Sequence, residues 1–151
     1  MSRVQADGSS VEAWVGIVSA YRAVHALLNQ ELVKSSLTFP QYRVIRALGK
    51  FGAMPMSKLG EHMVVTPANI TGLVDRLEGR GYIKREGTGT DRRITRIALT
   101  REGETTYRQT SIQHSRLVSH IMRALSENER LTVAKLLQKI KEAALEERGG
   151  A

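Results

Sequence analysis

The sequence predicts a mainly α-helical fold with one small β-hairpin, and three observations lead to this prediction. Apolar residues recur at three- and four-residue spacing through most of the 151 residues, which is the period of amphipathic helices. Two helix-start signals, Thr38-Phe39-Pro40-Gln41 and Ser126-Glu127-Asn128-Glu129, have the form of capping boxes. Two short β-prone runs flank a glycine-rich, cationic stretch over residues 87–93.

Composition and charge narrow the possible partners. The 41% content of hydrophobic residues can form a core, so the length fits one compact domain or two very small ones that share a core. Of the net charge of +8, most lies in residues 39–100, which hold 11 basic and 5 acidic residues. Such a segment predicts binding to a polyanion, with nucleic acid as the commonest partner and an anionic membrane surface as the alternative.

The residue types also exclude several classes of site. The chain has no cysteine, which excludes disulfides, zinc-finger cysteine ligands, iron–sulfur clusters and thiol redox switches. His114 and His120 lie six residues apart, on different faces of a helix, so we expect no metal site and no cofactor. The chain lacks a Gly-rich phosphate loop, a nucleophile elbow and a paired-carboxylate cleft, so the sequence predicts that it is not an enzyme.

No segment predicts a membrane span or a signal peptide. The longest stretch without Asp, Glu, Lys or Arg is His62 to Val74, which is short and contains a proline and an asparagine. The N-terminus has no apolar block of signal-peptide length. We therefore expect a cytoplasmic protein whose residues 1–10 form a disordered lead-in.

The first half of the chain reads as helices joined by short connectors. We expect helices over residues 11–32, 38–50 and 57–63, with a connector over 51–55. The next helix start is the most strongly specified, because Thr66 is a favoured N-cap residue and Pro67 occupies the first helical position. This helix should run to about residue 80, where Gly79 and Gly81 can adopt the positive φ that ends a helix.

The helix over residues 67–80 has two different faces. Ile70, Leu73, Val74 and Leu77 follow the spacing of a buried stripe. The opposite face carries small or hydrogen-bonding residues: Ala68, Asn69, Thr71, Gly72, Asp75 and Arg76. A face of this composition does not belong to a core.

The second half of the chain adds a hairpin and two helices. Residues 82–86 and 94–99 are expected to be strands, with a flexible tip between them. Thr100 caps a helix that reaches about residue 125, and the Ser126 capping box begins the last helix, which reaches about residue 147.

A short helix, a tight turn, a second helix and a basic hairpin together have the layout of a winged helix-turn-helix, which binds double-stranded DNA. Small residues such as Ala68 and Gly72 would let the recognition helix approach the bases of the major groove. Asn69 suits adenine, Thr71 a thymine methyl group or a hydrogen-bond acceptor, and Arg76 guanine or a phosphate. Asp75 is expected to orient an arginine, the helix start at Thr66 to favour a phosphate, and Arg92 or Arg93 to enter the minor groove.

The run from Val65 to Arg85, followed by Asp91-Arg92-Arg93 and Leu99-Thr100-Arg101-Glu102-Gly103, closely resembles the MarR family of transcriptional regulators. Residues 37–42 are similar to that family's entry to its second helix, so the resemblance covers about residues 11–147. One departure is Val64, where many helix-turn-helix turns carry glycine.

The resemblance implies an architecture and a mode of action. It implies a single domain over 11–147, in which 38–99 form the DNA-binding lobe and the helices of 11–37 and 100–147 interlock in a homodimer. It implies a regulator, most simply a repressor, on a pseudo-palindromic operator, with a small anionic or aromatic ligand that alters affinity. It further implies that Asp91 orients Arg93 by an ion pair, and that Arg22, Phe39 and His114 occupy the positions of a ligand pocket.

Simpler interpretations remain open for each of these residues. The outer face of the helix over 67–80 and the hairpin tip could be ordinary solvated surface, Arg22 could pair with a glutamate, and His114 could be a core histidine. A sequence-nonspecific architectural DNA-binding protein would share the basic middle segment without an operator or a ligand. Membrane binding is not expected, because the charge lies on a helix–hairpin unit and not along one amphipathic face.

Overall fold

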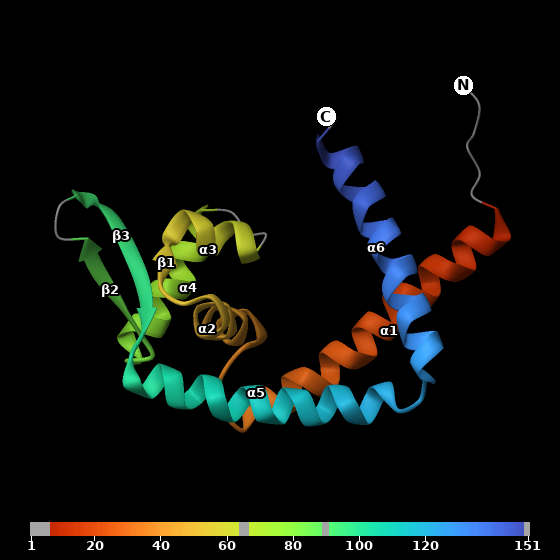
Figure 1. The fold of residues 1–151 in the computed structure, drawn as a ribbon, viewed down its shortest axis with the longest axis horizontal. Helices are drawn as coiled ribbons and strands as arrows, with labels where there is room; N and C mark the ends of the chain where they lie inside the picture. Colours follow the sequence, from red (N-terminus) through yellow and green to blue (C-terminus); the bar gives the residue numbers. More distant parts are fainter. Residues whose placement is uncertain (1–6, 64–66, 89–90, 150–151) are drawn as a thin grey trace. The chain divides into compact units, whose positions relative to one another are not determined.

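The computed structural model describes residues 7–63, 67–88 and 91–149, with the backbone alone for residues 67, 88, 91–94, 148 and 149. The helices are α1 (Gly8–Val33), α2 (Phe39–Phe51), α3 (Met56–Met63), α4 (Pro67–Gly79), α5 (Arg101–Met122) and α6 (Glu127–Gly149). The strands are β1 (Met54–Pro55), β2 (Ile83–Thr88) and β3 (Asp91–Leu99). The predicted fold, mainly α with a small β-hairpin, is confirmed (Figure 1). The chain consists of two compact units, residues 1–114 and 115–151, and the boundary between them lies within α5.

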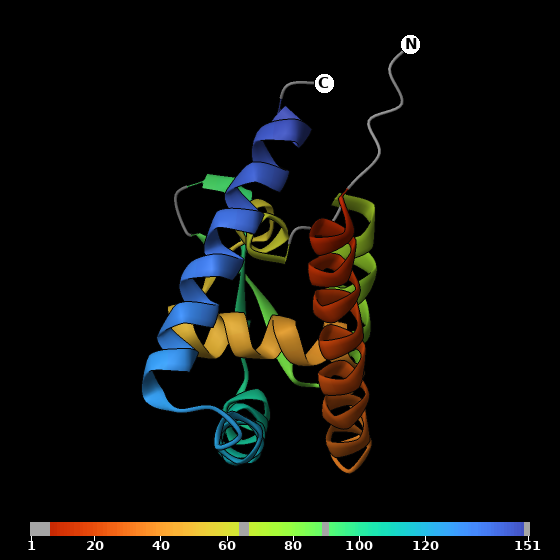
Figure 2. The same cartoon turned by 90° about the vertical axis from the view of Figure 1, so that its right-hand side faces the viewer.

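The first helix begins earlier than the sequence predicts. Asp7 is its N-cap residue, and the Asp7 carboxylate accepts a hydrogen bond of 2.9 Å from the Ser10 backbone N–H. Hydrogen bonds from the Ser9 side chain and from the backbone and side chain of Ser10 lower the pKa of this carboxyl group to about 2. The prediction of a disordered lead-in is therefore wrong for residues 8–10, which form the first turn of one continuous helix (Figure 2).

The second helix begins as predicted. The Gln41 N–H donates to Thr38 Oγ1 at 3.4 Å, and the Thr38 N–H donates to Gln41 Oε1 at 3.0 Å, which completes the capping box. The helix ends at Gly52, whose φ of +79° a glycine adopts without strain. The predicted connector contains β1, a two-residue strand that the sequence did not reveal.

The sheet has the order β1-β3-β2, and both pairs are antiparallel. Met54 lies opposite Ile97, and Ile83 lies opposite Leu99. The hairpin of β2 and β3, here called the wing, is longer than predicted. Residues 87–88 and 91–93 belong to strands, so the prediction of a tip over 87–93 is wrong for these residues; a register shift follows Gly87.

The core of the first unit lies where α2, α3 and α4 gather beside the sheet (Figure 1). Its most buried large side chains are Tyr42, Ile45, Leu59, Leu77, Ile83 and Ile97. They come from α2, α3, α4 and both strands of the wing, so the core fixes α4 relative to the wing.

The long helices contrast with this core. In α1 only Leu32 is buried, while Trp14 is 64% exposed and Tyr21 is 62% exposed. In α6, which belongs to the second unit, every residue whose side chain is described is exposed, including Leu131 and Leu136. These apolar residues have the spacing of a buried stripe, but the described residues do not cover them.

Candidate nucleic-acid interface

Helix α4 has the two faces that the sequence predicts. Ile70, Leu73, Val74 and Leu77 are all buried, with no more than 8% exposed. The opposite face carries the predicted contact residues: Ala68, Asn69, Thr71, Asp75 and Arg76 are exposed and Gly72 is half-buried. Pro67 is the first residue of α4, whereas Thr66 lies outside the described residues, as does Val64.

Gly72 keeps the middle of this face flat. A Cβ atom built at Gly72 would meet only Arg76 Nη2, at 3.7 Å, which is ordinary van der Waals contact. The fold would therefore accept a methyl group at Gly72. The absence of a side chain there instead favours a surface that another molecule approaches closely.

Arg85 of β2 joins the recognition helix to the wing. Its Nη2 atom lies 2.5 Å from Asp75 Oδ1, its Nη1 atom pairs with Glu78, and its backbone N–H also donates to Glu78. The hydrogen bond that Arg85 donates to Asp75 contributes most to raising the pKa of Arg85 above its already high value. The expectation that Asp75 orients an arginine is confirmed, and the guanidinium fixes α4 against β2 over about one helical turn.

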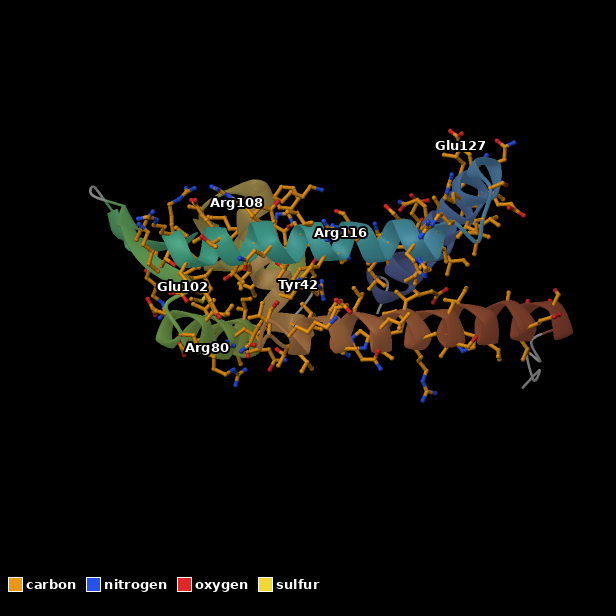
Figure 3. The ribbon with its side chains drawn as sticks, turned by 90° about the horizontal axis from the view of Figure 1, so that it is seen from below. Tyr42, Arg80, Glu102, Arg108, Arg116 and Glu127 are labelled. Atoms are coloured by element: carbon orange, nitrogen blue, oxygen red, sulfur yellow. The ribbon has the colours of Figure 1, made fainter. Side chains whose placement is uncertain are left out.

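Two further arginines, Arg80 and Arg96, connect separate segments of the DNA-binding lobe through backbone carbonyls. Arg80 Nη1 donates to the Ser36 carbonyl at 2.7 Å, and the Arg80 guanidinium lies 4.9 Å from the centre of the Tyr82 ring. Figure 3 shows Arg80 beyond the end of α4. Arg96 donates to the Ala53 carbonyl next to β1. The sequence did not reveal these roles, because neither partner is a charged residue at a helical spacing.

The short helix α3 supports α4 from the other side. The Thr71 hydroxyl lies 3.6 Å from the Met56 sulfur, and Leu59 and Met63 are buried against the same core as Ile70. On β2, Lys84 pairs with Glu86 at 2.8 Å. Asp91, Arg92 and Arg93 lie in β3 by their backbone, but their side chains are outside the described part, so the predicted Asp91–Arg93 ion pair stays a prediction.

The candidate ligand residues lie in the first unit, near α2. The half-buried rings of Phe39 and His114 both lie near Tyr42, with ring centres 6.4 Å and 5.7 Å from the centre of its ring. His25 packs edge-on to Phe39 at 4.7 Å. Arg22 is exposed on α1, and no hydrogen bond or ion pair joins it to another described residue. Phe39 and His114 thus share Tyr42 as a neighbour, and Arg22 has no contact of this kind among the described residues.

Tyr42, which the sequence analysis did not single out, carries an unusual polar atom. Its ring is 2% exposed, and its hydroxyl has no hydrogen-bond partner within the described residues. Burial raises the pKa of Tyr42, and burial with the nearby Arg46 charge lowers the pKa of His114. A buried hydroxyl without a partner beside a neutral imidazole can accept a polar group from a bound molecule.

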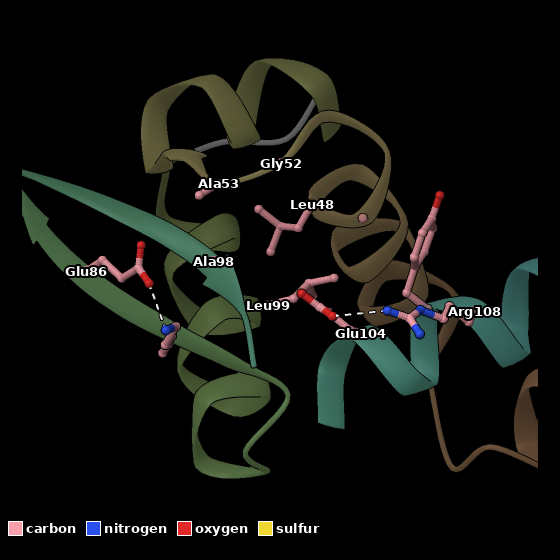
Figure 4. A pocket seen from close by; sticks show the side chains of 11 residues that line it. Leu48, Gly52, Ala53, Glu86, Ala98, Leu99, Glu104 and Arg108 are labelled. Carbon is pink, nitrogen blue, oxygen red and sulfur yellow. Dashed lines mark hydrogen bonds and ion pairs between the residues drawn. The ribbon is translucent and has the colours of Figure 1, made fainter. Parts of the chain in front are cut away.

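A cavity of about 620 Å³ lies elsewhere in this unit, between the end of α2, the wing and the start of α5 (Figure 4). The Lys84–Glu86 and Glu104–Arg108 pairs border it, and none of the predicted ligand residues lines it. Within the described residues, no helix is long and apolar enough to cross a membrane. The same residues contain no group of three His, Cys, Asp or Glu side chains that could hold a metal ion.

Comparison with known proteins places this geometry in a family. Residues 37–95 match the model of the MarR family. A curated relative, the HTH-type transcriptional repressor MdtR of Bacillus subtilis, is 26% identical over 139 residues, which are 92% of this chain and 90% of that protein. The crystal structure of AbsC, a MarR-family transcriptional regulator from Streptomyces coelicolor, has a TM-score of 0.85 at 23% identity and covers 93% of this chain and 97% of AbsC.

A structure of Bordetella bronchiseptica BpsR, whose DNA binding is regulated by 6-hydroxynicotinic acid, has a TM-score of 0.76 at 23% identity. It covers 86% of this chain and 98% of BpsR. MarR-family members regulate transcription and are not enzymes, which agrees with the function class that the sequence predicts. The helix-turn-helix with its attached wing, residues 37–95, matches the MarR family of transcriptional regulators, and the chain is similar along most of its length to a curated HTH-type transcriptional repressor.

Proposed function

We propose that the protein is a repressor that binds a pseudo-palindromic operator as a homodimer and changes its affinity when it binds a small anionic or aromatic molecule. The observation that carries the proposal is the outer face of α4, which is exposed, small at Ala68 and Gly72, and fixed to the wing by Arg85. A rigid face that presents Asn69, Thr71 and Arg76 suits base reading, because a bidentate contact tolerates little misplacement.

The exposed apolar stripes support the homodimer. Leu131, Leu136 and Leu145 of α6 are each more than half exposed, and so are Trp14 and Val15 of α1. Monomeric proteins rarely leave long apolar faces in water. A second copy of the chain, related by a two-fold axis, would cover the same stripes on both molecules and would place two recognition helices on two half-sites.

The group around Tyr42 supports a ligand. Phe39 and His114 offer aromatic faces, and Arg46 contributes a positive charge near His114. The regulation of BpsR by 6-hydroxynicotinic acid, an aromatic carboxylic acid, agrees with this chemistry. Tyr42 belongs to α2, and α2 packs against α4. A molecule that moves Tyr42 would therefore change the position of α4, the recognition helix.

Selection of bound fragments from the organism's own genomic DNA tests this function. The expected result is one enriched motif with two inverted half-sites about one helical turn apart, centre to centre. The selection is repeated with aromatic carboxylic acids present, and at least one should reduce recovery of the motif. Fragments recovered without a shared motif would favour the architectural alternative.

A further inference from the structure

The second unit contains a concave surface of about 740 Å³ where α5 ends and α6 begins. Its residues are Ser115, Arg116, Val118, Ser119, His120, Met122, Arg123 and Arg130. Six of them belong to the last two turns of α5, Arg123 is the first residue after α5, and Arg130 lies in the first turn of α6. Its volume lies within the range of small-molecule sites, about 300–1,000 Å³.

The polar side chains of the lining are three arginines, two serines and one histidine. Arg116 and His120 are spaced i and i+4 and so share one face of α5, and Arg123 and Arg130 line the same surface. No guanidinium of this group lies within 4.0 Å of a carboxylate of the described residues. Elsewhere on α5, in contrast, Arg108 pairs with Glu104 at 3.4 Å. The surface therefore holds three arginine charges that form no direct ion pair with a described acidic group.

Two hydrogen bonds hold these donors in place. Arg123 Nη2 lies 2.7 Å from His120 Nδ1, and Arg130 Nη1 donates to the Met122 carbonyl at 3.1 Å. Since a guanidinium only donates, His120 Nδ1 is the acceptor of this hydrogen bond. Both arginines keep further N–H groups for a ligand, and Ser115 and Ser119 add hydroxyl donors.

We propose that this surface, the arginine cradle of Arg116, Arg123 and Arg130, binds a small molecule with at least two phosphate or carboxylate groups. Arg116 and Arg123 lie seven residues apart in the chain, and Arg130 follows on α6. A molecule with two linked anionic groups can contact more than one of these guanidinium groups at the same time. Planar guanidinium groups bind such oxygens with paired hydrogen bonds.

Calorimetric titration of the full-length protein tests the cradle, with inorganic phosphate, tripolyphosphate and citrate as probes at constant ionic strength. We expect the dissociation constant of tripolyphosphate or of citrate to be lower than that of phosphate by about tenfold or more. The probe that binds more tightly, tripolyphosphate or citrate, identifies phosphate or carboxylate as the preferred group. Arg116→Gln combined with Arg123→Gln should weaken that binding by about tenfold or more. Arg108→Gln removes the same charge from the same helix outside the cradle and should change nothing. Arg76→Gln, on the DNA-binding face, should also leave the titration unchanged.

Four results would overturn the cradle. Equal binding of all three probes, or no effect of the double variant, would mean an adventitious ion only. A dissociation of the double variant into monomers by light scattering would make the arginines an intersubunit contact. A loss of DNA affinity in the double variant, with anion binding unchanged, would make them a DNA-backbone contact. No detectable binding of tripolyphosphate or citrate to the folded wild type would remove the site altogether. None of these four results contradicts the proposed operator binding of the wild-type protein, so the two proposals can fail independently of each other.

Discussion

At the scale of single residues, the proposed DNA contact depends both on the side chains that α4 presents and on the missing side chain at Gly72. Asn69 and Arg76 supply hydrogen-bond donors, but they reach a base edge only if the backbone lies close to the groove. Gly72 removes the side chain that would stand between them. Arg85 then holds the helix by Asp75 and Glu78, so the donors are positioned before DNA arrives.

Gly72→Ala separates the fold from the DNA contact. The added methyl group meets Arg76 at ordinary contact distance, and alanine favours a helix interior over glycine by about 0.5–1 kcal/mol. We expect a thermal midpoint that is unchanged or raised, together with an operator affinity that falls about tenfold. Thermal denaturation and fluorescence anisotropy measure the two quantities. Gly79→Ala, at an open position of the same helix, is the matched control, and equal operator affinity for both variants would refute the close approach.

His114 predicts a pH dependence of stability. Burial, with Arg46 as the second cause, lowers the pKa of His114 in the folded protein below its ordinary value of 6.5. Below that value the unfolded chain binds the proton more readily, so the free energy of unfolding decreases as the pH falls through the interval between 6.5 and the lowered pKa. Urea denaturation at several pH values should show this decrease in the wild type and a smaller one in His114→Phe. Parallel curves for the two proteins would contradict the assignment.

At the scale of elements, the sequence predicted what local chemistry determines. The capping boxes at Thr38 and Ser126, the cap at Thr100 and the two-faced α4 follow from side chains within one or two helical turns. The sequence could not predict β1, because two residues have no periodicity, nor the length of the wing, because strand pairing overrode the glycine signal. The arginine contacts of the site also escaped, since Arg80 and Ser36 meet only in the fold.

The end of α4 gives a prediction at this scale. Gly81 has a φ of +74°, its N–H donates to the Glu78 carbonyl, and the Tyr82 N–H donates to the Leu77 carbonyl, which is the Schellman arrangement. Gly81→Ala should lower the free energy of unfolding by about 1–2 kcal/mol, because an L-residue resists this conformation. Gly79→Ala, two residues earlier and within the helix, should not lower it. Equal destabilisation in denaturant titrations would show that backbone conformation is not the cause.

At the scale of the whole molecule, the exposed apolar stripes favour the proposed homodimer. Leu136 on α6 is 51% exposed, and the adjacent Lys135 is exposed as well. Leu136→Glu should convert the dimer to a species near the 16.8 kDa mass of one chain, while Lys135→Glu should leave it at twice that mass. Light scattering over a range of concentrations distinguishes the two. A wild-type protein that is monomeric at every concentration would refute the homodimer.

If α4 reads DNA sequence, the protein binds its operator more tightly than a random duplex. The ratio of these two affinities measures that preference directly. Two duplexes of equal length, the selected operator and a scrambled sequence, are titrated with wild type and Asn69→Ala at physiological salt. The wild type should prefer the operator by about 10³-fold or more. Asn69→Ala should lose about 1–3 kcal/mol of that preference while it binds the scrambled duplex as before. A wild-type ratio near one, or an equal loss on both duplexes, would contradict base reading by this helix.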